Sequence, residues 1–356
     1  MDQKQQAMEL WRQCFNDSEE FIRFYFERKY TPENTLLYAE NGQALSVLQM
    51  LPYAMTWEDL SVTTAYISGA CTLPKARNRG IMSRLLCQAF QEMYHRRISF
   101  TTLIPAETWL FRYYAGLGYT PVFDYSQQTY TPGPSPHSTQ SMVKTQSEFN
   151  EPWVRKQYPY FNEEMNKREN CIQHSLEDYL AVVEEAYLSG GSLWCCQNGH
   201  TASGWALAVP ETDTVHIKEF FYRTPTEKGW LLQAIHTQWP HKKLTGKVPP
   251  TGPSAQHLGM ARIIDVASML QHFALRHKDI RLTLRIDDPQ LPINNGTYQI
   301  AAGKCLHFPQ SADRIDHALD IPTLTQALLG YHTSQLPSPL NRLLKDVSPY
   351  MSLMMD

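Results

Sequence analysis

The residues with the clearest capacity for chemistry lie between 65 and 90, where a β-rich run leads through a proline and a basic turn into an amphipathic helix. Backbone N–H groups in the first turn of a helix have no partner inside the helix, and the helix dipole favours negative charge there. A glycine lets the backbone approach a phosphate closely, and arginines add cationic side chains. We therefore predict an anion site suited to a pyrophosphate, formed by Arg77, Arg79, Gly80, Ile81, Met82, Ser83 and Arg84.

The turn also resembles the pyrophosphate loop of the GNAT superfamily, Gln/Arg-x-x-Gly-x-Gly/Ala. Here the corresponding letters are Arg77-Asn78-Arg79-Gly80-Ile81-Met82, with Met82 in place of the final small residue. The form Arg-x-x-Gly followed by two apolar residues, Ile81 and Met82, resembles the loop of the Eis-like (enhanced intracellular survival) branch of the superfamily. The resemblance implies acetyl-CoA as the cofactor. The alternative for these residues is a solvated basic turn before a surface helix.

A second motif follows at Tyr114-Ala115-Gly116-Leu117-Gly118-Tyr119. It resembles the Tyr-x-x-x-Gly-Phe/Tyr sequence that ends the catalytic core of GNAT proteins, in which the tyrosine protonates the departing coenzyme A thiolate. The resemblance implies that Tyr114 is the general acid, a role that suits the chemistry because an unsolvated thiolate is a poor leaving group. The adjacent Tyr113 stays an alternative acid, and a core aromatic is the alternative role for Tyr114.

The strand before the loop is expected to hold the thioester. In GNAT folds two central strands splay apart, so that the pantetheine arm adds to the exposed strand edge through backbone hydrogen bonds. The resemblance places Cys71, Thr72 and Leu73 at that edge, and Gly69 is consistent with the bulge that opens such a strand. Cys71 itself is expected to be a small half-buried residue, because no histidine or aspartate stands in a position that would activate it.

The attacking amine needs a base, because a lysine-like amine has a pKa of about 10 and is mostly protonated at neutral pH. Eis-like proteins are thought to use the chain's own C-terminal carboxylate, delivered to the first domain by the third. Here the resemblance points to the carboxylate of Asp356, at the end of an apolar tail that reads Tyr-Met-Ser-Leu-Met-Met-Asp. The alternative is a frayed terminus.

The elements around these residues predict an α+β fold of mixed sheets, in which tandem GNAT-like domains are followed by a sterol-carrier-like domain. Apolar spacing predicts two short helices over 5–29, three strands, a helix over 83–97, a strand and an aromatic helix. A similar order of elements recurs over 145–250 without its own Arg-x-x-Gly loop. The segments 260–270, 287–300 and 320–330 resemble the sterol-carrier-like end of Eis-like proteins. We predict domains at 1–135, 145–252 and 255–356, with the proline-rich stretch 131–144 as a linker.

The composition argues against several classes of binding partner. The net charge is −3 in 356 residues, which gives no global field for nucleic acid or an anionic membrane. The seven cysteines form no CxxC pair, so neither a disulfide framework nor a metal site is indicated. The N-terminus lacks a signal-peptide core, and no stretch approaches the roughly twenty apolar residues of a membrane span. We therefore expect a cytoplasmic protein that binds no metal.

The function predicted from these features is acetyl-CoA-dependent N-acetylation of a primary amine. The acceptor stays open between an aminoglycoside-like molecule, a peptide lysine and a polyamine. The alternative is a non-catalytic lipid- or partner-binding protein that keeps a GNAT scaffold. Eis-like relatives can form symmetric oligomers, so a homo-oligomer is also an open alternative.

Overall fold

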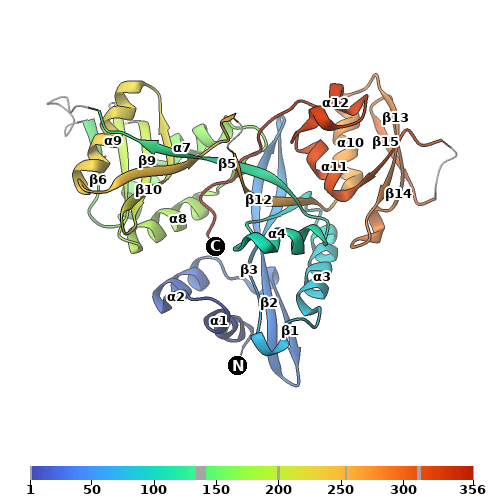
Figure 1. Cartoon of the computed structure of the whole chain (residues 1–356), viewed down its shortest axis with the longest axis horizontal. Coiled ribbons are helices and arrows are strands. Elements are labelled where there is room, and N and C mark those ends of the chain that lie inside the picture. Colours follow the sequence, from blue (N-terminus) through green and yellow to red (C-terminus); the bar gives the residue numbers. More distant parts are fainter. Residues whose placement is uncertain (1, 134–141, 199–200, 253–254, 311–313, 356) are drawn as a thin grey trace. The chain divides into compact units, whose positions relative to one another are not determined.

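The computed structural model describes residues 2–133, 142–198, 201–252, 255–310 and 314–355, and Figure 1 shows the whole chain. Most of the predicted linker, residues 134–141, lies outside the described residues. The chain divides into two compact units. The first comprises residues 2–123 and 258–349, and the second comprises residues 124–257 and 350–355.

The N-terminal part of the first unit follows the predicted order of helices and strands. Its elements are α1 (Gln3–Cys14), α2 (Glu19–Arg28), a 3₁₀ turn η1 (Pro32–Asn34), β1 (Thr35–Glu40), β2 (Gln43–Trp57), β3 (Leu60–Thr72), a 3₁₀ turn η2 (Pro74–Ala76), α3 (Ile81–His95), β4 (Phe100–Leu103), α4 (Thr108–Ala115) and the start of β5 (Thr120–Tyr130). Ser18 caps α2 by accepting from the backbone N–H of Phe21.

The sheet of the first unit runs in the order β1-β2-β3-β4-β12. Asn41 and Gly42 join β1 to β2, and both have positive φ, as a tight two-residue hairpin requires. All neighbours in this sheet are antiparallel except β3 and β4, which are parallel. A parallel pair needs a crossover, and α3 supplies it.

The two faces of this sheet are covered by different helices (Figure 1). One face packs against α3 and α4 and forms an apolar core that includes Leu48, Met50, Ile67 and Phe90. The other face lies against α1 and α2. There the ring of Trp11 sits so close to Gly69 that a Cβ at residue 69 would be 2.5 Å from it.

The C-terminal part of the first unit adds a second, smaller sheet. Its elements are β12 (Gln256–Ile263), α10 (Val266–Arg276), β13 (Arg281–Asp287), a 3₁₀ turn η4 (Pro292–Asn294), β14 (Gly296–Ala301), β15 (Lys304–Phe308), β16 (His317–Asp320), α11 (Ile321–Leu328), a 3₁₀ turn η5 (Thr333–Gln335) and α12 (Leu340–Leu343). The strand order is β15-β14-β13-β16, and β13 and β16 are parallel. The buried side chains of α10 include Met269, Leu270 and Phe273.

The second unit repeats the mixed-sheet plan. Its elements are the end of β5, β6 (Val143–Thr145), α6 (Glu151–Arg155), α7 (Tyr158–Asn166), β7 (Ile172–Gln173), α8 (Leu176–Leu188), β8 (Ser192–Asn198), β9 (Thr201–Pro210), β10 (Thr214–Tyr222), α9 (Pro225–Gln238) and β11 (Lys243–Val248). The strand order is β5-β11-β10-β9-β8-β6, with β10 and β11 parallel and α9 as their crossover. Within the described ranges, every helix is too short or too polar to cross a bilayer.

Candidate active site

The predicted anion loop leads into the N-terminus of α3. Gly80 is the N-cap with φ of +69°, a left-handed conformation that costs a side-chain-bearing residue free energy. A Cβ at residue 80 would meet only the guanidinium of Arg84, at 3.7 Å, so the space beside the glycine is open. No side chain in the described part of the chain caps this helix. The backbone N–H groups at the start of α3 therefore keep the capacity to bind an anion.

The three predicted arginines hold the loop in shape through different contacts. Arg77 donates from Nε to the carbonyl of Thr72 at 3.1 Å, and Arg84 donates from Nη1 to the carbonyl of Arg79 at 3.1 Å. Arg79 forms an ion pair of 2.6 Å with Glu40, and the hydrogen bond from Arg79 lowers the pKa of that carboxyl. Glu40 ends β1, and nothing in its local sequence indicated this role, because the pair is 39 residues apart.

The strand edge beside the loop opens as the GNAT resemblance implied. The parallel ladder between β3 and β4 pairs Thr64 with Phe100 and ends where Tyr66 pairs with Thr102. Beyond this point β3 continues to Thr72 without β4 beside it. The strands therefore part after Tyr66 and leave one edge of β3 without the parallel partner.

A β-bulge lies on this open stretch. In the pairing with β2, Cys71 is opposite Val47 and Ser68 is opposite Gln49, so two residues of β3 face one residue of β2. Gly69, with φ of +58°, is one of the two, which confirms the predicted bulge.

Of the three residues predicted at the edge, one has its amide already engaged. The N–H of Leu73 donates to the carbonyl of Leu45 at 2.9 Å, so this amide is paired with β2, and the place of Leu73 in the cofactor site stays a prediction. Successive amides of a strand point to opposite sides, so the amide of Thr72 faces away from β2. Cys71 was expected to be half-buried, and the structure buries it more fully, at 7% exposure.

Cys71 is in contact with a second thiol that the sequence did not single out. Its side chain hydrogen bonds to Cys14 at the end of α1, and this contact together with burial raises the pKa of Cys71. The same hydrogen bond, assisted by the nearby charge of Arg77, lowers the pKa of Cys14 to about 7. Cys14 is therefore the more acidic thiol of the pair, because it alone gains a donor for its thiolate.

The two tyrosines of α4 lie in different surroundings. Tyr113 is half-buried, and its hydroxyl is 3.0 Å from the hydroxyl of Ser83 in the first turn of α3. The ring of Tyr114 is buried in the core between the sheet, α3 and Tyr119. Its hydroxyl makes no hydrogen bond to any described residue, and burial raises the pKa of Tyr114. The Tyr114 proton is thus held firmly and has no competing acceptor in the described chain.

The glycine of the tyrosine motif has a clear physical reason. Gly118 has φ of +85°, and a Cβ there would be 3.1 Å from Nε of Arg262. Arg262 is fully buried, donates to the carbonyl of Leu117 at 3.0 Å and pairs with Asp288 at 2.5 Å. This ion pair connects the end of the tyrosine motif to the C-terminal part of the same unit.

The second unit lacks an open helix terminus at the equivalent crossover. Thr224 is the N-cap of α9, and its hydroxyl accepts from the backbone N–H of Glu227. The Glu227 carboxylate in turn accepts from the N–H groups of Arg223 and Thr224 at 3.0 and 2.9 Å. Because these side chains satisfy the donors that a diphosphate would use, this helix terminus does not suit the cofactor.

The C-terminal tail was expected to reach the first domain. Asp356, the predicted base, lies outside the described residues. The described part of the tail, Tyr350 to Met355, belongs to the second unit. There Tyr350 donates its N–H to Asn170, and Ser352 donates its hydroxyl to the buried carboxylate of Glu219 at 2.8 Å.

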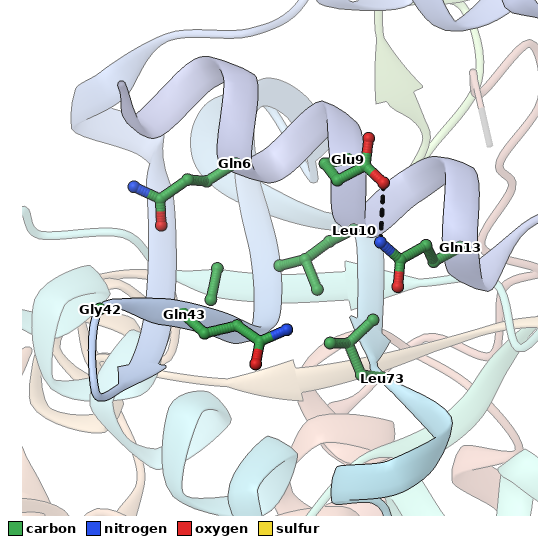
Figure 2. A pocket seen from close by; sticks show the side chains of 8 residues that line it. Gln6, Glu9, Leu10, Gln13, Gly42, Gln43 and Leu73 are labelled. Atoms are coloured by element: carbon green, nitrogen blue, oxygen red, sulfur yellow. Dashed lines mark hydrogen bonds between the residues drawn. The ribbon is translucent and has the colours of Figure 1, made fainter. Parts of the chain in front are cut away.

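A pocket of about 290 Å³ lies against α1 near the end of β3 (Figure 2). It is lined by Gln6, Glu9, Leu10, Gln13, Gly42, Gln43, Ala44 and Leu73. The Glu9 carboxylate in this wall accepts from the Gln13 amide at 2.7 Å. The lining shares only Leu73 with the predicted cofactor residues, so this pocket does not coincide with the predicted cofactor site. Among the described residues, no three potential metal ligands come together.

Comparisons with known proteins agree with this architecture. Residues 1–122 match the family described as acetyltransferase (GNAT) domain, and residues 266–351 match the sterol carrier protein domain. No curated protein has a significant match to the chain. The domain bounds predicted from the sequence stay predictions.

Three solved structures cover nearly the whole chain. A probable N-acyltransferase of Enterococcus faecalis V583 has a TM-score of 0.75 at 16% identity, covering 98% of this chain and 96% of the other. A GCN5-related N-acetyltransferase of Anabaena variabilis has a TM-score of 0.74 at 17% identity, with 98% and 97% covered. Eis1 of Mycobacterium abscessus has a TM-score of 0.68 at 11% identity, with 100% and 96% covered. At these identities the likeness shows the fold.

Residues 1–122 are therefore a GNAT acetyltransferase domain, and the solved structures show that the whole chain shares their fold. The chain has a GNAT domain first and a sterol carrier domain last, and its fold is similar to that of Eis1. The predicted α+β fold of mixed sheets, with a GNAT domain and a C-terminal sterol-carrier-like domain, is confirmed.

Proposed function

We propose that this protein transfers the acetyl group of acetyl-CoA to a primary amine, at one site per chain in the first unit. The observation that carries the proposal is the uncapped start of α3 at Gly80, close in sequence to a strand whose edge is open beyond Tyr66. The first feature suits a diphosphate and the second suits an extended arm that adds as a strand. Both belong to residues of the matched GNAT domain.

The arrangement supports a direct transfer. The diphosphate binds the amides of Ile81, Met82 and Ser83 together with the cationic side chains of the loop. The pantetheine arm lies along the open edge of β3, where the amide of Thr72 donates to it. A backbone N–H of the bulge polarises the acetyl carbonyl as negative charge develops on its oxygen.

The proton transfers complete the reaction. The neutral amine attacks the thioester carbon, the carbon–sulfur bond breaks, and the coenzyme A thiolate takes the proton of Tyr114. Tyr114 is preferred to Tyr113 because the Tyr113 hydroxyl is already engaged with Ser83. The Eis-like resemblance extends the proposal to the C-terminal carboxylate of Asp356 as the base that removes the amine proton. The acceptor is an aminoglycoside-like molecule, a peptide lysine or a polyamine.

Calorimetry and a thiol-release assay test this function. Acetyl-CoA should bind the whole protein with a stoichiometry of about one, and addition of an accepted amine should release free coenzyme A thiol. Kanamycin, Nα-acetyl-lysine amide and spermidine represent the three acceptor classes. A protein that binds no acetyl-CoA would refute the proposal and favour a scaffold that serves only to bind a lipid or a protein partner.

A further inference from the structure

Helix α1 lies against the end of β3, on the face of the sheet that looks away from α3. The ring of Trp11 in α1 is close to Gly69 of β3, where a Cβ would be 2.5 Å from it. Leu10 of α1 and Leu73, the residue directly after β3, line the same pocket (Figure 2). The last turns of α1 are therefore in contact with the last residues of this strand.

Two cysteines meet at this contact. Cys14 is three residues after Trp11, so the two side chains lie on the same face of α1. Cys71 is opposite Val47 in the pairing of β2 with β3. Val47 points away from α3, because the next residue, Leu48, belongs to the core under α3. Cys71 therefore points toward α1, where its side chain hydrogen bonds to that of Cys14.

The two thiols differ in exposure and in acidity. Cys14 is partly exposed, so a small reagent can reach its sulfur, whereas Cys71 is buried. The hydrogen bond from Cys71 and the charge of Arg77 lower the pKa of Cys14 to about 7, so a thiolate is present at neutral pH. An accessible thiolate in contact with a second thiol is the usual arrangement of a redox-sensitive cysteine pair.

We propose that Cys14 and Cys71 are a peroxide-sensitive pair that forms a disulfide, with Cys14 as the thiol oxidised first and Cys71 as the resolving thiol. The Cys14 thiolate attacks one oxygen of hydrogen peroxide, the O–O bond breaks, and hydroxide leaves, which makes a sulfenic acid at Cys14. The Cys71 sulfur then attacks the sulfur of Cys14, the S–O bond breaks, and the hydroxide leaves as water with the Cys71 proton. The two thiols together lose two electrons, which reduce the peroxide.

The place of the pair gives this oxidation a structural consequence. Cys71 precedes Thr72, whose carbonyl accepts from Nε of Arg77 in the predicted cofactor loop at 3.1 Å. A disulfide here joins the end of α1 to this strand by a covalent bond and removes the negative charge of the Cys14 thiolate from beside Arg77. The inference does not depend on acetyl transfer, because it concerns only the two thiols and the peroxide.

Peroxide treatment of the full-length protein tests the inference. The reduced protein is treated with hydrogen peroxide at pH 7, the remaining thiols are blocked with iodoacetamide in denaturant, and the peptides are weighed. A peptide pair joined through Cys14 and Cys71 should appear, two hydrogen atoms lighter than the sum of its parts. Dithiothreitol should separate the pair before blocking, because the oxidation is reversible.

Two other cysteines are controls within the same sample. Cys87 and Cys305 are also partly exposed, and burial raises the pKa of both thiols. Cys14 should therefore be oxidised at least about fivefold faster than either, because its larger thiolate fraction outweighs its lower intrinsic nucleophilicity. Cys87 and Cys305 should be recovered mainly as alkylated thiols.

Paired variants separate the two roles. Cys71→Ser keeps a hydroxyl donor beside Cys14 but removes the resolving sulfur, so dimedone should trap a sulfenic acid at Cys14 and no joined peptide should form. Cys14→Ser should leave Cys71 reduced, because the buried thiol lacks an accessible partner. Cys87→Ser, the matched control, should form the joined peptide at the wild-type rate.

Three results would overturn the inference. The first is wild-type protein in which Cys14 passes to sulfinic acid while Cys71 stays reduced, since the second thiol then resolves nothing. The second is oxidation of Cys14 no faster than that of Cys87 and Cys305. The third is a joined peptide that links Cys14 to a cysteine other than Cys71.

Discussion

Replacing Tyr114 by phenylalanine is the sharpest test of the chemistry. The Tyr114 hydroxyl has no hydrogen-bond partner in the described chain, so its removal should cost little stability and leave acetyl-CoA affinity unchanged. If it protonates the thiolate, turnover should fall by about 10²-fold or more, the usual contribution of a general acid. A 10²-fold loss corresponds to about 2.7 kcal/mol of transition-state stabilisation.

Tyr113→Phe is the matched control. It removes the hydrogen bond to Ser83, worth about 1 kcal/mol, and should lower stability slightly with a much smaller effect on turnover. Turnover is measured as free thiol released at saturating acetyl-CoA, and affinity by calorimetry. Unchanged turnover in Tyr114→Phe together with a large loss in Tyr113→Phe would refute the assignment.

The pH profile gives an independent check on the same residue. Burial, and then the nearby Tyr113, raise the pKa of Tyr114. An acid must be protonated to act, so activity attributed to Tyr114 is lost only when pH rises through its raised pKa. The alkaline decline of kcat should therefore lie above the ordinary tyrosine value of about 10. A decline well below that value would show that another group is the acid.

Three further outcomes are expected. Gly80→Glu should abolish acetyl-CoA binding in calorimetry, because it adds a strained left-handed backbone and a carboxylate at the predicted anion site. Gly190→Glu, at another glycine with positive φ, is the control and should leave acetyl-CoA binding unchanged. Alkylation of Cys14 by iodoacetamide should become faster as pH rises through about 7, because only the thiolate reacts. Peptide mass analysis should find this alkylated peptide in the wild type and not in a Cys14→Ser protein. Glu219→Gln replaces the buried carboxylate that pairs with the partly buried Arg168 by a neutral amide, and it should lower the free energy of unfolding by about 3 kcal/mol in urea titrations. Glu163→Gln, at an exposed ion pair, should not change that free energy.

Much of the fold could be predicted from local patterns. The Asn41-Gly42 hairpin and the Ser18 helix start depend on interactions within a few residues, so the sequence states them directly. The crossover from β3 through the Gly80 loop into α3 was likewise predictable, since its conformation is set by one glycine and the turn around it. Strand lengths were less predictable. β2 extends to Trp57 because its pairing with β3 continues to that residue.

The site depends more on distant contacts. The sequence alone named Arg79 but not Glu40, which pairs with it, and named Cys71 but not Cys14.

The sequence by itself therefore determined which loop can receive a diphosphate and which tyrosines stand near it in the chain, because helix starts and glycine turns are local properties. Only the tertiary structure decided which amides and hydroxyls already form hydrogen bonds within the chain. The N–H of Leu73 is paired with the carbonyl of Leu45 on the neighbouring strand, and the Tyr113 hydroxyl, unlike that of Tyr114, lies within hydrogen-bond distance of Ser83. These outcomes depend on residues tens of positions apart, which meet only when the strands pair and the helices pack.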